Sequence, residues 1–255
     1  MRALAVDEDV IVVVSAIWQT TCTAVRAGEE GFLIDSPVLP DELEALPSLA
    51  EQAGFPVSGL LVTHGDWDHL LGRLAFPEAT LGAGEPTARR LAAEPGAAAR
   101  ALRAFDEEHY VEGRRPLGLA GVQSLPVPGR LAIGDAELEL HPAGGHTVDG
   151  TIFWLPWVSV LVCGDYLSPV EIPMIGGSVV AYMETLGRLS EFVERATTVV
   201  PGHGAPLGGE EAKRVLEEDV AYVDGLSKEG EPRLPEGRRS SEQHKIHAAN
   251  LATLG

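Results

Sequence analysis

The stretch that most constrains the fold is residues 60–69, Leu-Leu-Val-Thr-His-Gly-Asp-Trp-Asp-His. Its apolar start predicts a short buried strand, and the next six residues from His64 hold four polar side chains, the others being Asp66, Asp68 and His69. Alternation would turn the first three to one side, and His69 would begin the next helix. Imidazole nitrogens and carboxylate oxygens suit Zn, Mn or Fe, and an open coordination position would make such a site catalytic. The alternative is a hydrogen-bonded polar turn.

Three later segments repeat this design, in which an apolar strand ends in a polar residue beside glycine. They are Gly144-Gly145-His146-Thr147, Cys163-Gly164-Asp165 and Pro201-Gly202-His203-Gly204. Glycine at these places allows a tight turn and a close approach of the backbone to a buried ion. Each segment alone is more typical of an ordinary turn. Together with the first cluster, they indicate a metal centre assembled from several strand ends.

The length and composition favour one soluble domain. The chain has 255 residues, of which 45% are hydrophobic and 22% charged, and it contains neither a repeat nor a clear linker, so we expect a single domain over residues 1–255. The net charge of -19 disfavours nucleic acid and anionic membranes as partners, because both would be repelled. We therefore expect a small-molecule substrate. A homodimer remains an open alternative.

The cysteines and the N-terminal segment indicate an intracellular location. Cys22 and Cys163 lie in apolar, β-like stretches, which favours two buried thiols over a disulfide. The start of the chain runs quickly into Asp7-Glu8-Asp9 without the apolar core of a signal peptide. Apolar runs stay shorter than the ~18 residues that a transmembrane helix needs. We therefore expect a cytoplasmic protein.

The order of the expected elements indicates an α/β fold. In the first half, apolar and β-branched runs predict strands at residues 10–17, 20–26, 32–34, 60–62 and 79–83, and helices at 40–53 and 70–76. This strand–helix–strand order indicates a partly parallel or mixed sheet. Residues 85–110, broken by Pro95-Gly96, predict two helices that form an insertion or scaffold segment. In the second half we expect strands at 131–133, 136–141, 151–155, 158–162 and 197–200, helices at 178–195 and 209–227, and a surface loop with a short terminal helix over 228–255.

As a set and in this order, the motifs resemble those of the metallo-β-lactamase superfamily. That family's first motif is His-x-His-x-Asp-His, and a Gly-His-Thr, a strand-ending Gly-Asp and a Pro-Gly-His follow it. The resemblance covers most of residues 10–204. It implies a four-layer αββα sandwich of two mixed β-sheets flanked by helices, with two metal ions at the edge shared by the sheets. Asp35 also sits where the family usually has a structural aspartate.

The resemblance further implies seven metal ligands in two sets that share one bridging carboxylate. They are His64, Asp66 and His146 for one ion, Asp68, His69 and His203 for the other, and Asp165 between them. Asp66 departs from the pattern, because the commonest version has histidine there. By a rough count, two divalent ions (about +4), three aspartates (about −3) and one hydroxide give a neutral cluster, whereas a histidine version would keep about +1. We therefore expect two divalent ions, either zinc or the harder manganese or iron.

The implied activity is that of a metal-dependent hydrolase, in which a hydroxide at the dinuclear site attacks a small ester-like substrate such as a thioester or lactone. Asp68 would orient that hydroxide and pass a proton to the leaving group. Tyr166 and Tyr182 are candidate oxyanion donors, with simple packing as the alternative role. A phosphodiesterase is one alternative function, although the chain has no basic stripe. A diiron-type oxidoreductase is another, because flavodiiron-type relatives place a carboxylate at the position of Asp66, yet this chain has no room for their flavin domain.

Three further features have open roles. The loop at residues 165–178, which contains Ile172, Met174 and Ile175, either lines an apolar substrate pocket or anchors on the core. Trp67 is expected to pack beneath the site. His244 and His247 lie three residues apart on the terminal helix, and we expect both mainly in solvent.

Overall fold

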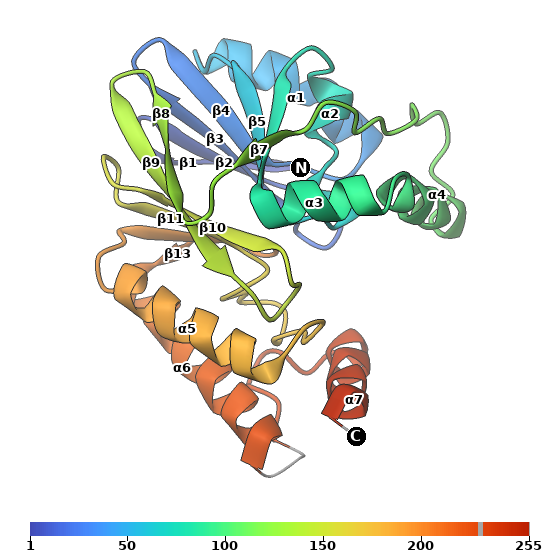
Figure 1. Cartoon of the computed structure of the whole chain (residues 1–255), viewed down its shortest axis with the longest axis vertical. Coiled ribbons are helices and arrows are strands. Elements are labelled where there is room, and N and C mark those ends of the chain that lie inside the picture. The colour runs from blue at the N-terminus through green and yellow to red at the C-terminus, as the bar shows by residue number, and fades with distance from the viewer. Residues whose placement is uncertain (229–231, 255) are drawn as a thin grey trace.

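The computed structural model describes residues 1–228 and 232–254, and its strands form two sheets (Figure 1). The first sheet has seven strands, which lie side by side in sequence order: β1 (Arg2–Asp7), β2 (Val10–Val14), β3 (Thr21–Ala27), β4 (Glu30–Asp35), β5 (Gly59–Val62), β6 (Thr80–Gly84) and β7 (Gln123–Leu125). Strands β1 to β4 pair antiparallel, whereas β4 to β7 pair parallel. This sheet is therefore mixed.

The second sheet has six strands: β8 (Gly129–Ile133), β9 (Ala136–Ala143), β10 (Gly150–Leu155), β11 (Val160–Gly164), β12 (Thr198–Pro201) and β13 (Leu207–Gly208). Their spatial order is the reverse of their order in the sequence. Only the β11–β12 pair is parallel, and the other pairs are antiparallel. Both sheets are thus mixed, as the sequence indicated.

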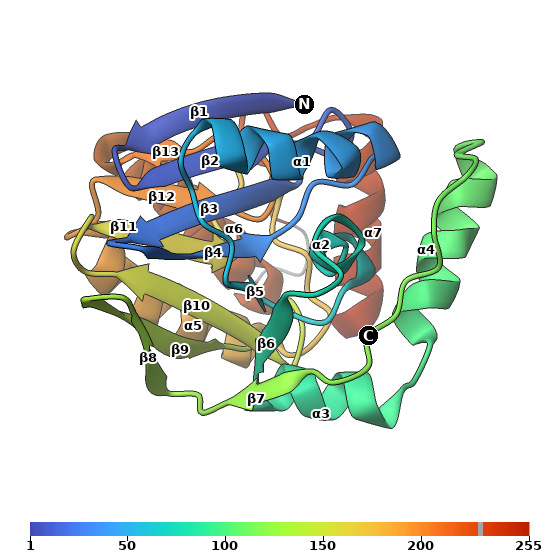
Figure 2. The same cartoon turned by 90° about the horizontal axis from the view of Figure 1, so that it is seen from above.

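Helices cover the outer faces of the sheets. They are α1 (Pro40–Gln52), α2 (Gly72–Ala75), α3 (Glu85–Ala93), α4 (Ala97–Glu108), α5 (Val179–Val193), α6 (Gly209–Lys228) and α7 (Ser241–Leu254), with a 3₁₀ turn η1 (Trp67–His69) before α2. Figure 1 shows α5 and α6 side by side against the second sheet. Figure 2 shows α1 and α2 against the first. All of these helices lie within the described part of the chain.

Three apolar clusters lie between these layers. One joins the first sheet to α1, α2 and α4, one joins the second sheet to α5 and α6, and the third lies between the sheets. Strand alternation explains how β2 serves two of them, because Val10, Val12 and Val14 face the space between the sheets while Val13 faces the outer cluster. The order helix, sheet, sheet, helix confirms the predicted αββα sandwich.

The structure differs from the sequence-based expectations in several places. The first expected strand ends at Val14 rather than near residue 17, and β1 precedes it without having been predicted. His69 does not begin a helix but closes η1, three residues before α2 starts. Residues 229–231, part of the expected surface loop, lie outside the described residues. Within the same loop, Arg238 is only 2% exposed, so the expectation of a solvated segment is wrong there.

The cysteines are as expected, and the helices give one further finding. Cys22 and Cys163 are free and buried. None of the helices over residues 1–228 and 232–254 combines the length and apolarity needed to cross a bilayer.

Candidate metal centre

The site forms where the ends of strands from both sheets meet. His64 follows β5 in the first sheet, and His146, Asp165 and His203 follow β9, β11 and β12 in the second. A backbone hydrogen bond from Thr21 N to Gly202 O, 2.8 Å long, joins the sheets at this edge. Polar side chains that are far apart in the sequence therefore gather at one place, as the strand-end motifs predicted.

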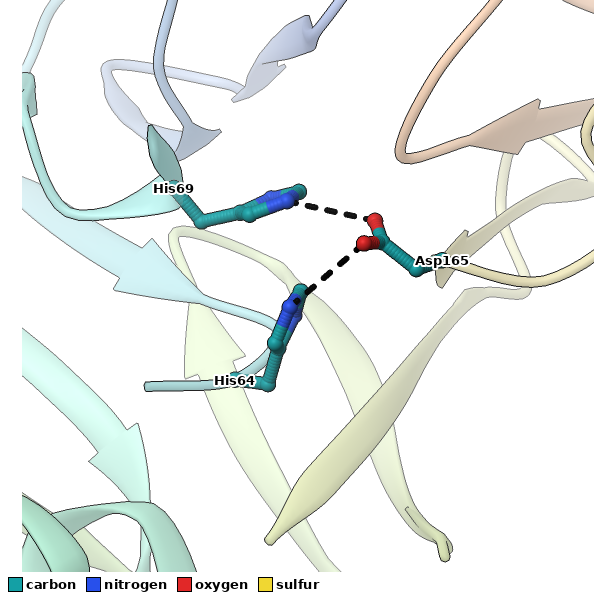
Figure 3. Close-up of side chains that lie close together, drawn as sticks. All are labelled: His64, His69 and Asp165. Atoms are coloured by element: carbon teal, nitrogen blue, oxygen red, sulfur yellow. Dashed lines mark ion pairs between the residues drawn. The ribbon is translucent and has the colours of Figure 1, made fainter. Parts of the chain in front are cut away.

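Asp165 is the centre of this arrangement. Its carboxylate oxygens lie 3.1 Å from Nε2 of His146, 3.2 Å from that of His69, 3.4 Å from that of His203 and 3.7 Å from that of His64. Figure 3 shows two of these imidazoles, those of His64 and His69, directed at the two oxygens of Asp165. One carboxylate thus faces four imidazole nitrogens.

Two further carboxylates divide the cluster into halves. Oδ2 of Asp66 lies 3.5 Å from Nε2 of His64 and 3.6 Å from Nε2 of His146, and we call these three residues the Asp66 half. Oδ2 of Asp68 lies 3.5 Å from Nε2 of His203 and 3.6 Å from Nε2 of His69, and these three form the Asp68 half. In each half, one potential ligand atom per residue lies within 4.8 Å of the others. The structure thus brings together all seven side chains that the sequence singled out as ligands.

The outer nitrogen of each imidazole lies beside an oxygen, and in His64, His146 and His203 the two atoms are within hydrogen-bonding geometry, whereas Nδ1 of His69 has only the ion-pair contact with Asp35. The neighbours of Nδ1 are Thr63 Oγ1 for His64 (3.0 Å), Asp35 Oδ2 for His69 (3.1 Å), Met174 O for His146 (3.2 Å) and Trp18 O for His203 (3.0 Å). Thr63 Oγ1 donates its own hydrogen to Asp35, so it accepts from His64. With the proton on Nδ1, each Nε2 directs a lone pair at the cluster, which is the tautomer that a metal ligand needs.

The cluster holds buried polar atoms without partners and an excess of carboxylate charge, and a bound cation would satisfy both. Nε2 of His64, His69 and His146 and Oδ1 of Asp165 are buried and have no hydrogen-bond partner among the described residues. Burial alone would lower the pKa of His146 and His203, but Asp165 and the neighbouring carboxylates outweigh it and raise both pKa values to about 10. Nitrogen and oxygen donors in this number are a set that divalent transition metals accept. The residues present therefore fit a metal centre.

Asp35 supports the Asp68 half through its contact with His69. It ends β4 with a φ of 61°, a left-handed conformation that is strained for a residue with a side chain. Its Oδ1 accepts a hydrogen bond from Thr63 N (2.8 Å), and its Oδ2 accepts one from Thr63 Oγ1 (2.9 Å). Because the same Oδ2 lies beside Nδ1 of His69, Asp35 ties the end of β5 to an imidazole of the cluster. This is the structural position that the family resemblance implied for Asp35.

Sequence reasoning missed Arg90 and Asp149. Arg90, on α3, donates to Asp66 Oδ1 (2.7 Å) and to Asp149 Oδ1 (2.8 Å). Asp149 is 1% exposed and lies in the turn between β9 and β10. Proximity to the His146 motif was the only signal for Asp149. Arg90 had none, because it is one of several arginines in a segment whose partners are distant in the sequence.

The two candidate tyrosines have different surroundings. Tyr166 is buried, and its hydroxyl donates to Gly144 O (2.8 Å) and accepts from His146 N (3.0 Å). This arrangement favours the packing role for Tyr166, which braces the turn before His146. Tyr182 is also buried, but it borders a cavity, and among the described residues the one hydrogen bond of its hydroxyl, 3.4 Å long, goes to Asp165 O. Its catalytic role stays a prediction.

A cavity of about 270 Å³ opens onto the cluster. Residues that line it include Asp66, Asp68, Asp165, His146 and His203, together with Trp18, Ile172 and Met174. Part of the loop at residues 165–178 therefore does line a pocket. Helix α7 also holds this loop, because Gln243 Oε1 accepts from Ile172 N (2.6 Å) and Asn250 Oδ1 accepts from Ile175 N (2.9 Å).

The remaining histidines and Trp67 lie outside the cluster. His244 is exposed, and His247 shares a hydrogen bond of 2.9 Å with the hydroxyl of Tyr222. Trp67 packs against the apolar cluster beneath the first sheet, with its ring centroid 4.8 Å from that of Phe105. These positions agree with the packing role expected for Trp67 and with a solvent-exposed His244, whereas His247 is half-buried, so the expectation of solvent exposure is wrong for it.

Comparison with known proteins gives both family and structural matches. A model of the metallo-beta-lactamase superfamily matches residues 16–203. Metallo-beta-lactamase type 2 from Bacteroides fragilis is 28% identical over 124 residues, which are 44% of this chain and 50% of that protein. The chain thus spans about half the length of this curated relative.

The structural matches extend over most of the chain. A metallo-beta-lactamase family protein from Thermus thermophilus has a TM-score of 0.68 at 19% identity, over 89% of this chain and 83% of that one. The sec-alkylsulfatase Pisa1 from Pseudomonas sp. has a TM-score of 0.69 at 15% identity, over 89% of this chain but only 42% of the sulfatase. A metallo-beta-lactamase from Pontibacter korlensis has a TM-score of 0.60 at 20% identity, over 85% and 97% of the two chains. At these identities, the matches show a shared fold.

The family match includes the four strand-end motifs, and the fold of two mixed sheets between helices is the one that the structural relatives share. Members of this family bind metal ions, typically zinc, which agrees with the acceptor-rich cluster at the edge of the sheets. By sequence and by fold, the chain belongs to the metallo-beta-lactamase superfamily.

Proposed function

We propose that this chain is a metal-dependent hydrolase of a small, uncharged ester-like substrate, of the thioester or lactone class. The observation that carries the proposal is the cavity at the cluster, where four imidazole nitrogens and three carboxylates converge within reach of a small molecule. Hydrolysis by a metal centre needs an open approach to the ions and a nearby proton carrier. The cavity supports the first requirement, and Asp68 supports the second.

The proposed ligands are those of the two halves, with Asp165 shared between them. The proposed cofactors are two divalent ions, zinc or else manganese or iron. When bound, such ions polarise a substrate oxygen and lower the pKa of water. The chain itself supplies the orientation of the imidazoles, because three of the four Nδ1 atoms are within hydrogen-bonding geometry of an oxygen, that of His69 lies 3.1 Å from Asp35, and all four histidines are buried.

Asp68 is the residue we propose for proton transfer. Its carboxylate borders the cavity, and the side chain is 11% exposed. There it can accept a proton from the attacking water and deliver that proton to the leaving group. Of the two tyrosines, only Tyr182 borders the cavity, so Tyr182 is the one we propose as a hydrogen-bond donor to the substrate oxygen.

The charge of the cavity supports a neutral substrate over a phosphodiester. Apart from the proposed ligands, its charged lining residues are Glu171, Asp219 and Glu242, and the described lining contains neither lysine nor arginine. Asp219 is paired with Arg238 at 2.5 Å, whereas no ion pair is found for Glu171 among the described residues. Burial raises the pKa of Glu171, which reduces its charge, but this described lining still supplies an anionic group with no cationic partner and favours a neutral one. The phosphodiesterase alternative therefore has less support.

The test is a substrate panel assayed with the metal-loaded enzyme. We expect turnover of a neutral thioester or lactone and at least about tenfold lower kcat/KM for a phosphodiester of similar size, because like charges disfavour its binding. A chelator and the Asp68→Ala variant should each abolish turnover, while Asp135→Ala, at an exposed aspartate far from the cavity, should not. Turnover that survives metal removal would contradict the proposal. Two equivalents of iron with oxygen consumption would favour the oxidoreductase.

The role of the cavity charge has its own test. Glu171→Gln should raise kcat/KM for the phosphodiester and leave that for the neutral ester within about twofold, because the carboxylate acts on the charge of the substrate. Glu184→Gln, at an exposed position on α5, serves as the control. Equal effects of Glu171→Gln on both substrates would contradict selection by charge.

A further inference from the structure

The two oxygens of Asp66 have different neighbours. Oδ2 faces the cluster, 3.5 Å from Nε2 of His64 and 3.6 Å from Nε2 of His146. Oδ1 points the other way and accepts a hydrogen bond of 2.7 Å from Nη2 of Arg90. A carboxylate can offer a metal ion either one oxygen or both. In Asp66, one of the two is already held by a guanidinium.

Arg90 is itself held in place by Asp149. Nη1 of Arg90 donates to Asp149 Oδ1 (2.8 Å), so the two arms of the guanidinium contact two different carboxylates. Asp149 Oδ2 accepts from Gly65 N (2.9 Å), and Asp149 O accepts from Thr87 Oγ1 (2.7 Å). The planar fork of arginine fixes direction as well as charge. We call Arg90 and Asp149 the bracket.

The bracket reaches the first motif through Gly65, which lies between the ligands His64 and Asp66. A Cβ atom at Gly65 would lie 2.9 Å from Asp149 Oδ2 and 3.3 Å from Cδ of Arg90. Glycine is therefore what allows the bracket to approach the backbone this closely. The same contact fixes the turn that presents Asp66 to the cluster.

We propose that the bracket makes Asp66 a one-oxygen ligand and thereby sets which metal ion the Asp66 half prefers. This inference rests on the proposed function, because it assumes that the cluster holds metal ions. A carboxylate that chelates with two oxygens favours hard ions with six ligands, such as Mn²⁺, whereas four ligands around the ion suit Zn²⁺. Arg90 holds Oδ1 away and draws electron density from the carboxylate. Aspartate favours hard metal ions more than the histidine that the family usually has at this position. The bracket thus offsets that preference.

Arg90 acts through Asp66, so it is a positioning residue. A purely structural salt bridge would change the stability of the protein and leave its choice of metal unaltered. The decisive readouts are therefore the competition between Zn²⁺ and Mn²⁺ and the visible absorption of Co²⁺, which is intense for four or five ligands and weak for six. Both are measured without substrate.

The experiment compares four proteins: wild type, Arg90→Leu, Arg90→Lys and Arg89→Leu. Arg89 is the matched control, because it neighbours Arg90 on α3 but is 66% exposed and pairs only with Glu85. Each metal-free protein is titrated with Co²⁺ and then with Zn²⁺ against Mn²⁺. For Arg90→Leu we expect weaker Co²⁺ absorption. We also expect the preference for Zn²⁺ over Mn²⁺ to fall by about 10–100-fold, which is the usual effect of removing a hydrogen-bond partner from a metal ligand. Arg90→Lys should restore part of the preference, and Arg89→Leu should match wild type.

The outcomes separate the two proposals. A wild-type protein that binds none of the three ions would overturn both the metal centre and the bracket. Metal binding by wild type with the same spectrum and preference in Arg90→Leu would overturn the bracket alone. If Arg90→Leu does not fold, Arg90→Gln decides in its place, since it keeps an amide donor but no charge. A loss of the Zn²⁺ preference in either variant supports the proposal.

Discussion

The two halves of the candidate centre use similar ligands but are held in different ways. Asp35, which is 3% exposed, braces His69 in the Asp68 half, and a backbone carbonyl fixes His203. In the Asp66 half, Thr63 and a backbone carbonyl fix the imidazoles, but Asp66 itself is held by Arg90, whose side chain is 31% exposed and lies on a surface helix. Arg90 and Asp66 also border a second cavity of about 470 Å³ beside α3 and α4. The histidines of both halves are therefore built into the core, whereas Asp66 is held from the surface.

This difference indicates which ligand positions of the family motifs can accept a different residue. A ligand braced by a buried carboxylate in a strained backbone position allows little substitution, because several bonds would be lost together. A ligand braced from a helix surface can change along with its brace. In this chain, the departure from the pattern, Asp66, lies in the half that the surface helix holds.

The largest expected effect is that of Asp165→Asn, which removes the only carboxylate shared by both halves. Losing this charge should lower the affinity of both halves for metal and reduce turnover by about a thousandfold, equivalent to several kcal/mol of lost charge stabilisation. Metal stoichiometry and kcat measured on the same sample check this. Unchanged binding of two ions by the variant would mean that Asp165 does not join the halves. Asp135→Asn is the control.

Asp35→Asn should affect mainly the Asp68 half. Asparagine has an NH₂ group in place of one of the two carboxylate oxygens. The variant therefore loses either the hydrogen bonds from Thr63 or the contact that orients His69. We expect one of two metal equivalents to bind about 10–100-fold more weakly, and the other to weaken less, because its His64 reaches Asp35 only through Thr63. Stepwise titration with Co²⁺ distinguishes the halves when it is compared with Arg90→Leu. Equal weakening of both equivalents by Asp35→Asn would contradict the separation of the halves.

The tyrosines offer a smaller test of the same comparison. Tyr166→Phe leaves the buried N–H of His146 without its partner and should lower the free energy of unfolding by about 1–3 kcal/mol, with kcat nearly unchanged. Tyr182→Phe should lower kcat by more than it lowers stability, since we propose that its hydroxyl contacts substrate. Thermal unfolding and kinetics on both variants decide the roles. A large loss of kcat with unaltered stability in Tyr166→Phe would return Tyr166 to the catalytic candidates.

The smallest expected effect concerns the two thiols. Burial raises the pKa of Cys22, and the nearby Asp35 raises it further, while burial and Asp165 do the same for the pKa of Cys163. A thiol with a raised pKa carries little thiolate, which is the reactive form. We expect neither thiol to react with a disulfide reagent at mildly alkaline pH in the folded protein, and both to react in denaturant. Rapid labelling of Cys22 alone would show that the Asp68 half opens more readily than its burial indicates.

The sequence predicted most of the fold and the inner part of the site. Strand ends carry a local signal, since an apolar run followed by Gly and a polar residue is visible within a few positions, as at His146 and His203. The sequence predicted the edge strands of the sheets least well. Strand β1 lies at an edge with several exposed residues, so it lacks the continuous apolar run that marked β2. The single domain remains a prediction.

By itself, the sequence determined which side chains would converge, because each potential ligand follows a buried strand and strand ends meet at one edge. Only the tertiary structure decided what surrounds them. Arg90 meets Asp66 across 24 positions and Asp149 across 59, and Arg238 is buried beside Asp219 although its own neighbours are polar. These pairings depend on which segments pack beside one another, and apolar periodicity marks the buried face of a helix without saying which strand or loop it will meet. The identity of the candidate ligands is a local property of the sequence, whereas the contacts that hold each of them are a property of the packed molecule.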